Sequence, residues 1–485
     1  MSRTSFRTFA LMALTLALCT ACTVGPDYKR PDVPTADSYT RSAFPATFGS
    51  EHDAQQLEPG ARIGRQWWSV FGSPPLDALI QRAFAHNPDI DSAKAALRVA
   101  QENLAAQRAA FLPSVQLGYA PSRQREAVGT VSPTLDSGAA LYTLHTAQLN
   151  IAYPVDVLGL TRRSTESLRA QADAQKFQLD AAYLTLASNV VAAAIQQAAL
   201  RAQIDATQQM IDADARALDI LHRQAELGYA SALDVAAQET ALAQAQQTLP
   251  ALQKQLEQTR DLLAVLAGDL PAQGGDTTFD LDALKLPHTL PLSLPSQLIE
   301  QRPDVRAAQA QVHAASAQVG VALANRLPQF ALSAQYGGSS TQFSRMFAND
   351  NLFWGLAGNL TQTVFDFGAL KHQQGSAEAA LQQSAAQDRS VVLVAFQNVA
   401  DALYALETDA RALEAARRAE TAAQRTADLT RRQLELGYVN VLVLLNAEQA
   451  LQQTRIARIQ AQAARLTDTA ALVQALGGGW DATEP

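Results

Sequence analysis

The sequence contains only two cysteines, Cys19 and Cys22, both close to its N-terminus. If a leader ending before Cys22 is removed, one cysteine remains, so neither a disulfide nor a cysteine nucleophile is expected. Charged residues make up 17% and aromatic residues 6% of the 485 residues, and the net charge is −8. This balance argues against nucleic acid as a partner. It also favours long, closely packed helices over a compact aromatic core.

Long apolar runs and enzyme motifs are also missing. We find no run of 18 apolar residues after the N-terminus, which argues against a protein with several membrane-spanning helices but not against a β-barrel. The seven histidines have no metal-ligand spacing. A P-loop and a nucleophile elbow are absent as well. We therefore expect no enzyme, no catalytic residue and no metal site.

Residues 1–21 have the pattern of an export signal. Arg3 and Arg7 precede a short apolar stretch, and the small residues Thr20 and Ala21 precede Cys22. Cys22 resembles the lipobox cysteine of bacterial lipoproteins, although Cys19 stands where a leucine is usual. The resemblance implies cleavage before Cys22 and N-palmitoyl and S-diacylglycerol groups on it, with no other cofactor. An ordinary signal peptide that is cut nearby is the alternative.

Two halves of the chain repeat one pattern. The sequence Leu-Gly-Tyr occurs at 227–229 and at 436–438, 209 positions apart (436 − 227). In each half, two prolines 25 positions apart open and close a helical stretch, at 88 and 113 and at 303 and 328. The pattern predicts two structural repeats with a segment before, between and after them: 22–64 as an extended N-terminal segment, 65–269, 270–295 as a crossover, 296–477, and 478–485 as a tail.

After each closing proline, the hydrophobic period changes from 3.6 to 2. Val115, Leu117 and Tyr119 alternate with polar or small residues, and three later runs behave in the same way. Strands of this length span a bilayer when they are tilted. A soluble hairpin packed on one face remains the alternative. The predicted strands cover about 114–124, 143–153, 329–339 and 351–363.

Long stretches almost without glycine or proline follow the second strand of each half. At about 1.5 Å per residue, the longer of them would form helices on the order of 100 Å long. Gly228 and Gly437 interrupt the pattern and predict the tips of two helical hairpins. The predicted helices cover about 160–227, 231–267, 369–436 and 440–476.

Four membrane strands cannot close a barrel alone, because open sheet edges are not tolerated in lipid and known barrels begin at about eight strands. Two, three or four copies would supply about 8, 12 or 16 strands. A closed ring of copies would also bring the long helices into a tube. The pattern therefore predicts an oligomeric conduit.

With these features, the chain resembles the outer-membrane efflux proteins, the TolC- and OprM-like family, in its NodT-type lipoprotein branch. Val24-Gly25-Pro26-Asp27-Tyr28, the two Leu-Gly-Tyr tips and Gly477-Gly478-Gly479-Trp480 carry the resemblance. It implies a membrane α+β fold, in which a homotrimer forms a 12-stranded outer-membrane β-barrel with four strands per chain. The barrel would continue as a periplasmic α-helical barrel, and the chain would be lipid-anchored in the outer membrane.

The resemblance also implies that the chain is the channel subunit of a tripartite efflux pump that exports small molecules. Its partners would be an inner-membrane RND transporter and a periplasmic adaptor protein. The adaptor would dock on the hairpin tips, at Leu227, Gly228 and Tyr229 and at Leu436, Gly437 and Tyr438. Type I protein secretion by the same fold is one alternative, and a periplasmic helical-hairpin scaffold or adaptor without a pore is another.

Residues just past the second tip close the periplasmic end in this family. When the family's tip motif is carried over to this sequence, Leu442 would form the apolar constriction. Asn446 stands where relatives usually carry Asp, and Gln449 stands where OprM-like proteins carry Arg. Asp234 could supply a carboxylate from the first tip. Packing at the hairpin base is the alternative role for Leu442 and Val443. A gate held by apolar contact and amides predicts closure that is insensitive to pH and salt.

Overall fold

The computed structural model describes residues 23–31, 38–41, 44–49, 53–61, 63–125, 141–275 and 277–479. The predicted signal peptide, Cys22 and most of the predicted tail lie outside the described residues. The chain divides into two compact units. Unit 1 contains, among the described residues, 23–31, 97–125, 141–175 and Ala308–Asp388, and unit 2 contains the remainder.

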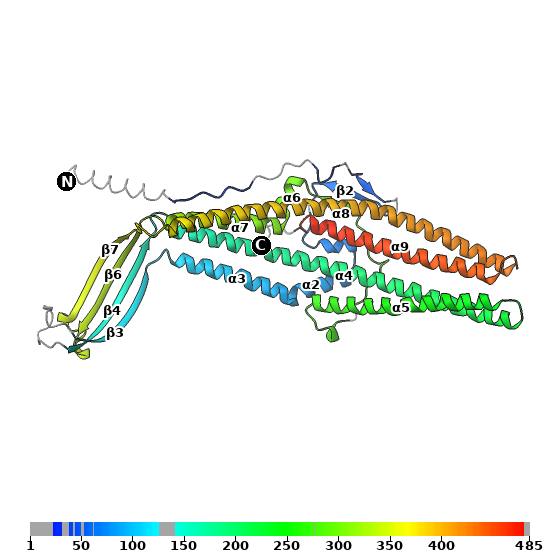
Figure 1. The fold of residues 1–485 in the computed structure, drawn as a ribbon, viewed down its shortest axis with the longest axis horizontal. Coiled ribbons are helices and arrows are strands. Elements are labelled where there is room, and N and C mark those ends of the chain that lie inside the picture. Colours follow the sequence, from blue (N-terminus) through cyan, green and yellow to red (C-terminus); the bar gives the residue numbers. More distant parts are fainter. Residues whose placement is uncertain are drawn as a thin grey trace. The chain divides into compact units, whose positions relative to one another are not determined.

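Unit 1 contains a four-stranded antiparallel sheet in the order β3–β4–β6–β7 (Figure 1). Two short 3-10 turns, η3 (Phe343–Arg345) and η4 (Asn349–Asn351), connect the last two strands. The strand bounds lie close to those predicted from the period-2 pattern. The strands are β3 (Ser114–Arg125), β4 (Leu141–Val155), β6 (Gln329–Ser340) and β7 (Leu352–Thr361).

One face of this sheet is apolar. The register pairs Leu117 with Leu149, Leu149 with Tyr336, and Tyr336 with Trp354, and cross-strand partners lie on the same face. Leu117 is 82% and Trp354 is 78% exposed, so this row is not covered within the described chain. The neighbouring row on the opposite face is polar or small: Gln116, Asn150, Gln335 and Gly355. The predicted alternation is therefore confirmed.

Both outer strands of the sheet have a free edge. Within the described chain, β3 pairs only with β4, and β7 pairs only with β6. A row of backbone N–H and C=O groups on each outer strand consequently has no strand partner, and such edges readily pair with another chain.

Four helices adjoin the sheet in sequence. Helices α3 (Pro88–Ala109) and α7 (Pro303–Ala324), of 22 residues each, precede β3 and β6. Helices α4 (Leu160–Glu226) and α8 (Ala369–Glu435), of 67 residues each, follow β4 and β7. An aspartate caps each long helix: Asp156 Oδ1 accepts from Thr161 N (3.0 Å) and Asp366 Oδ2 from Leu370 N (2.8 Å).

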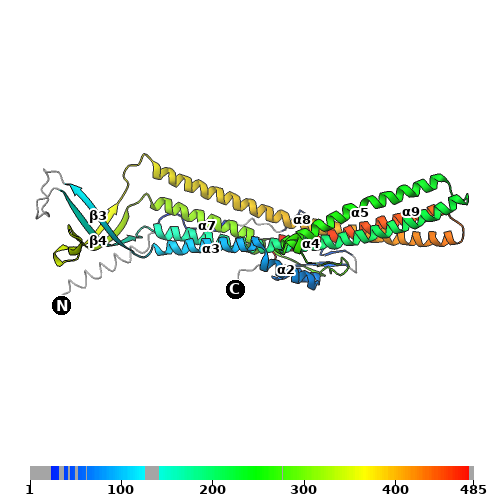
Figure 2. The same ribbon diagram turned by 90° about the horizontal axis from the view of Figure 1, so that it is seen from below.

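Unit 2 contains two helical hairpins. Helix α5 (Ala232–Leu266) returns from α4, and α9 (Val441–Ala475) returns from α8 (Figure 2). Alanines such as Ala194, Ala198 and Ala463 are buried where the helices meet, which allows close approach of their backbones. The shorter element η1 (Trp67–Phe71) adds its two tryptophans and Phe71 to the same core, and α2 (Pro74–His86) adds Leu76 and Ile80. Helix α6 (Pro295–Gln301) precedes α7.

A small sheet joins the N-terminal segment and the crossover. Strands β1 (Thr47–Phe48), β2 (Gln55–Pro59) and β5 (Thr289–Leu292) form it in that order, and β2 pairs with β5 in parallel. A further 3-10 turn, η2 (Pro271–Gln273), lies in the crossover. Strand pairing thus joins the predicted extended segment to the crossover, a connection that the sequence did not predict.

A buried arginine holds the N-terminal segment on α9. Arg465 is 1% exposed. Its guanidinium donates to Gln55 Oε1 (3.1 Å) through Nε, and through Nη2 to Phe48 O (3.3 Å) and Asp53 O (2.7 Å). Because a buried cation without partners is very costly, these contacts fix the segment to the helix.

Helices α4 and α8 each contain an 18-residue stretch that is apolar enough to cross a membrane. The expectation that no such stretch follows the N-terminus is therefore wrong for these two helices. The core helix of a soluble protein passes the same test, and half of the stretch in α4 is buried.

Candidate gate and docking site at the helix tips

Each long helix ends in the same backbone motif, built around a glycine. Gly228 has φ +79° and Gly437 has φ +75°, a conformation that glycine adopts without strain. After α4, Tyr229 N donates to Gln224 O (2.7 Å) and Gly228 N to Ala225 O (3.0 Å). This is a Schellman motif, and equivalent bonds end α8. The two predicted tips are therefore sharp, defined turns.

The return helices begin with side-chain caps. Ser231 and Asp234 form a capping box at the start of α5: Ser231 N donates to Asp234 Oδ2 (3.0 Å), and Asp234 N to Ser231 Oγ (3.2 Å). Hydrogen bonds from Ser231 lower the pKa of the Asp234 carboxyl. At α9, Asn440 Oδ1 accepts from Val443 N (3.2 Å). Asp234, considered above as a gate carboxylate, is thus occupied by its own helix cap.

The loops between the caps expose large apolar side chains. Leu227 is 71% and Tyr229 is 82% exposed, and Leu436 and Tyr438 are 70% and 79% exposed. The described chain leaves these four side chains largely uncovered. Exposed apolar groups on a rigid turn are suited to contact a partner protein.

Leu442 does not stand free at the second tip. It is half-buried and packs against a cluster that joins the two hairpins: Ala217 and Leu221 on α4, and Val441 and Leu445 on α9. Val443 is 45% exposed, so hairpin packing describes Leu442 better than Val443. Asn446 is exposed. Gln449 lines a cavity of about 490 Å³ between α4, α5 and α9.

Sequence reasoning missed an ion pair that links the two helices of each hairpin. Arg431 Nη2 on α8 lies 3.0 Å from Glu448 Oε1 on α9, and the hydrogen bond to Glu448 raises the pKa of Arg431. In the first hairpin, His222 Nε2 lies 3.9 Å from Glu239 Oε1. His222 and Arg431 are again 209 apart (431 − 222), as are the two glutamates, so the repeat itself contained the signal.

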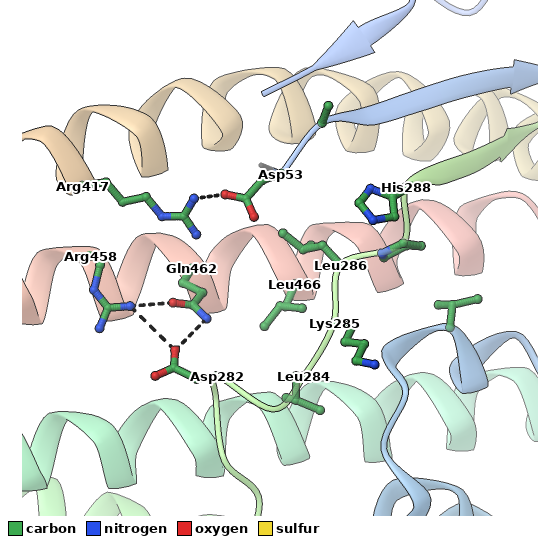
Figure 3. Close-up of a pocket in the computed structure, with 13 residues that line it drawn as sticks. Asp53, Asp282, Leu284, Lys285, Leu286, His288, Arg417, Arg458, Gln462 and Leu466 are labelled. Carbon is green, nitrogen blue, oxygen red and sulfur yellow. Dashed lines mark hydrogen bonds and ion pairs between the residues drawn. The ribbon is translucent and has the colours of Figure 1, made fainter. Parts of the chain in front are cut away.

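Figure 3 shows a second polar site, where the N-terminal segment and the crossover meet α8 and α9. Asp53 pairs with Arg417, and Asp282 Oδ1 accepts from Gln462 Nε2 (3.2 Å) and lies 3.9 Å from Arg458 Nη1. These contacts border a cavity of about 550 Å³. Because each contact joins one of the two segments to a long helix, we assign this site a structural role. Within the described residues, no three side chains of His, Cys, Asp or Glu could hold a metal ion.

Comparison with known proteins identifies the family. The family model described as "Outer membrane efflux protein" matches residues 79–269 and 294–478. The chain belongs to the outer membrane efflux protein family. This confirms the resemblance seen in the sequence and the location in the outer membrane.

Individual relatives of this efflux protein cover nearly its whole length. It is 31% identical over 424 residues to the pyoverdine export outer membrane protein OpmQ of Pseudomonas putida, covering 87% of this chain and 89% of OpmQ. It is 28% identical over 471 residues to the toluene efflux pump outer membrane protein TtgC of Pseudomonas putida, with 97% and 95% covered.

Solved structures share the fold of this efflux protein. The Campylobacter jejuni CmeC outer membrane channel superposes with a TM-score of 0.85 at 18% identity, covering 96% of each chain. The outer-membrane channel OprN gives a TM-score of 0.83 at 24% identity and covers 95% of this chain and 100% of OprN.

Proposed function

We propose that this chain is the outer-membrane channel subunit of a tripartite efflux pump. Three copies form a 12-stranded barrel and a periplasmic helical tube, through which small molecules pass without chemical change. An inner-membrane RND transporter supplies the energy, and a periplasmic adaptor joins it to the channel. N-palmitoyl and S-diacylglycerol groups on Cys22 anchor each chain in the outer membrane.

The observation that carries this proposal is the four-stranded sheet of unit 1. It has one exposed apolar face and two edges without a strand partner in the described chain. In lipid, each unpaired backbone group costs several kcal/mol, so both edges must be closed by other copies. The alternative of a scaffold without a pore does not account for this apolar face.

Small-molecule export is favoured over protein secretion by the relatives. OpmQ exports pyoverdine, and TtgC belongs to a toluene efflux pump. Pyoverdine and toluene are both small molecules. We extend that substrate class, but neither compound, to this chain.

The hairpin tips supply the gate and the docking surface in this proposal. The adaptor contacts the exposed Leu-Gly-Tyr turns at 227–229 and 436–438. Leu442 closes the tube by holding the two hairpins together, and Asn446 and Gln449 add hydrogen bonds. Packing of Leu442 against the cluster that joins α4 and α9 supports this role, since outward movement of the second hairpin would open that cluster.

Conductance of the purified full chain in planar bilayers tests both parts. We expect a trimer by light scattering in detergent, and a small conductance that rises when Leu442 is replaced by serine. Leu233→Ser is the matched control, because Leu233 occupies the equivalent position of the first hairpin and is 77% exposed. A monomer without conductance would contradict the channel, whereas equal conductance of both variants would remove only Leu442 from the gate.

A further inference from the structure

The described chain begins at Thr23, the residue after the proposed lipid acceptor, and its first residues are hydrogen-bonded to the start of α4. Val24 N donates to Leu158 O (3.3 Å), in the turn between β4 and α4. Arg163 on α4 donates through Nε to Val24 O (3.1 Å) and through Nη2 to Gly25 O (3.3 Å). The backbone of this segment is therefore held on unit 1.

Arg163 is the centre of these contacts. It is only 4% exposed, although it carries a full charge. Asp27 Oδ1 lies 2.7 Å from its Nη2, and Glu166 Oε2 lies 2.8 Å from its Nη1. One of its two carboxylate partners thus comes from the N-terminal segment and the other from α4. Departure of the segment would leave the buried guanidinium with fewer acceptors, which is costly.

Two glycines allow the segment to lie directly on α7 and on the β4–α4 turn. A Cβ atom on Gly25 would stand 2.4 Å from the Cα of Gly320, closer than any real contact allows. A Cβ atom on Gly159 would stand 2.8 Å from Thr23 Cγ2. Both glycines also have positive φ, +96° and +82°. Only a chain without side chains at these points can approach so closely.

Tyr28 completes the contact. Its ring stacks on His313 of α7 at 4.3 Å between centroids and 13° between planes, and His313 Nε2 lies 3.0 Å from Glu166 Oε1. Asp388 on α8 is 3% exposed. Burial and the charge of Asp388 raise the pKa of Tyr28. Burial also raises the pKa of Asp388, and the nearby charge of Arg30 partly offsets this. Three helices of unit 1 therefore contribute side chains that face this short segment.

We propose that these residues form a built docking site for the chain's own segment Thr23–Arg30, and that the site fixes where the lipid on Cys22 enters the membrane, beside the β4–α4 turn. The proposal rests on the proposed lipidation of Cys22. Thr23 lies against Gly159 in this turn, and adjacent Cα atoms are only about 3.8 Å apart, so a lipid attached to the preceding residue would enter the membrane close to the turn. With a flexible linker, the position of the lipid relative to the protein would instead vary by tens of ångströms.

Cleavage after Lys29 by a lysine-specific protease, on the folded full chain in detergent, tests the docking. Cleavage follows the population of the undocked form when opening is fast. Gly25→Ala should raise the cleavage rate about tenfold or more, because it forces the segment off Gly320. Gly60→Ala is the matched control: Gly60 also has a positive φ, +82°, but a Cβ there meets nothing within 4 Å.

Tyr28→Ala and Tyr28→Phe give a second test that does not depend on glycine. The alanine variant loses the stack on His313 and should also be cleaved faster, whereas the phenylalanine variant keeps the stack and should remain protected. Docking is refuted if Gly25→Ala and Tyr28→Ala are cleaved no faster than Gly60→Ala.

The position of the lipid is tested with a palmitate analogue that carries a diazirine near its carboxyl end. After incorporation and illumination, we expect cross-links within the chain at residues 156–163, and their loss when six Gly/Ser residues are inserted between Cys22 and Thr23. Equal cross-linking of both proteins would overturn the positional claim. If no analogue is incorporated at all, the lipidation proposal fails, while protection at Lys29 still reports on docking.

Discussion

Replacing Gly437 and Gly375 by alanine should have opposite effects on stability, although both glycines are in open surroundings. A Cβ atom at either position meets nothing within 4 Å, so no steric clash enters the comparison. Gly437 has φ +75°, which costs an alanine roughly 1–2 kcal/mol. Gly375 lies inside α8, where alanine is favoured over glycine by about 0.5–1 kcal/mol.

Hydrogen exchange of the full chain in detergent measures both effects locally. One kcal/mol corresponds to about a fivefold change in a local opening equilibrium. The amides of Gly437 and Tyr438, which close the Schellman motif, should therefore exchange about fivefold or more faster in Gly437→Ala. Amides around Gly375 should exchange more slowly in Gly375→Ala. Faster exchange in both variants, or no change at Gly437, would refute the argument that the tip depends on a left-handed glycine.

Three further changes test other parts of the structure. Burial, followed by the hydrogen bond and charge of Asp409, raises the pKa of Asp468 to about 7. Its protonated form therefore adds stability at low pH, and this stability is lost as pH rises through 7. Asp468→Asn should make the melting temperature depend less on pH between pH 5 and 8. His222→Arg should slow amide exchange at the first tip, because an arginine places a permanent positive charge beside Glu239, as Arg431 does beside Glu448 in the second hairpin. Arg465→Met should lower the thermal midpoint in detergent by the equivalent of about 2–5 kcal/mol, since it leaves buried acceptors on the N-terminal segment unpaired.

The strands and long helices could be predicted because each has a local periodic signal. Apolar and polar residues alternate in 114–124, so a strand there has one apolar and one polar face. This holds whether lipid or protein covers the apolar face. The long helices contain very few glycines and prolines, and a helix is most easily ended at one of these residues. The two tip glycines therefore marked the turns correctly.

The small sheet could not be predicted in the same way. Strand β1 has two residues, and β5 contains Pro291, which lacks the N–H that a strand usually donates. Its partner β2 lies more than two hundred positions earlier in the sequence, so no local pattern indicates the pairing. The same holds for Arg465, two of whose three acceptors are backbone oxygens that carry no sequence signal.

The candidate gate was harder still, because a pore is a property of several chains. The sequence places Leu442 just past the second tip, but the cluster against which it packs depends on how the two hairpins meet. The His222–Glu239 and Arg431–Glu448 pairs could have been predicted by folding each hairpin about its glycine. In both hairpins the basic residue lies six positions before the tip glycine and the glutamate eleven positions after it.

The two free edges of the sheet in unit 1 have a consequence for how the protein is made. A single chain gains little by entering the bilayer, because β3 and β7 would each present unpaired backbone groups to lipid. In the proposed channel, insertion and assembly must therefore occur as one step whose rate depends steeply on the local concentration of chains. Until that step, the apolar sheet must cross an aqueous compartment exposed, so newly exported chains depend on a holding factor or on rapid encounter with each other.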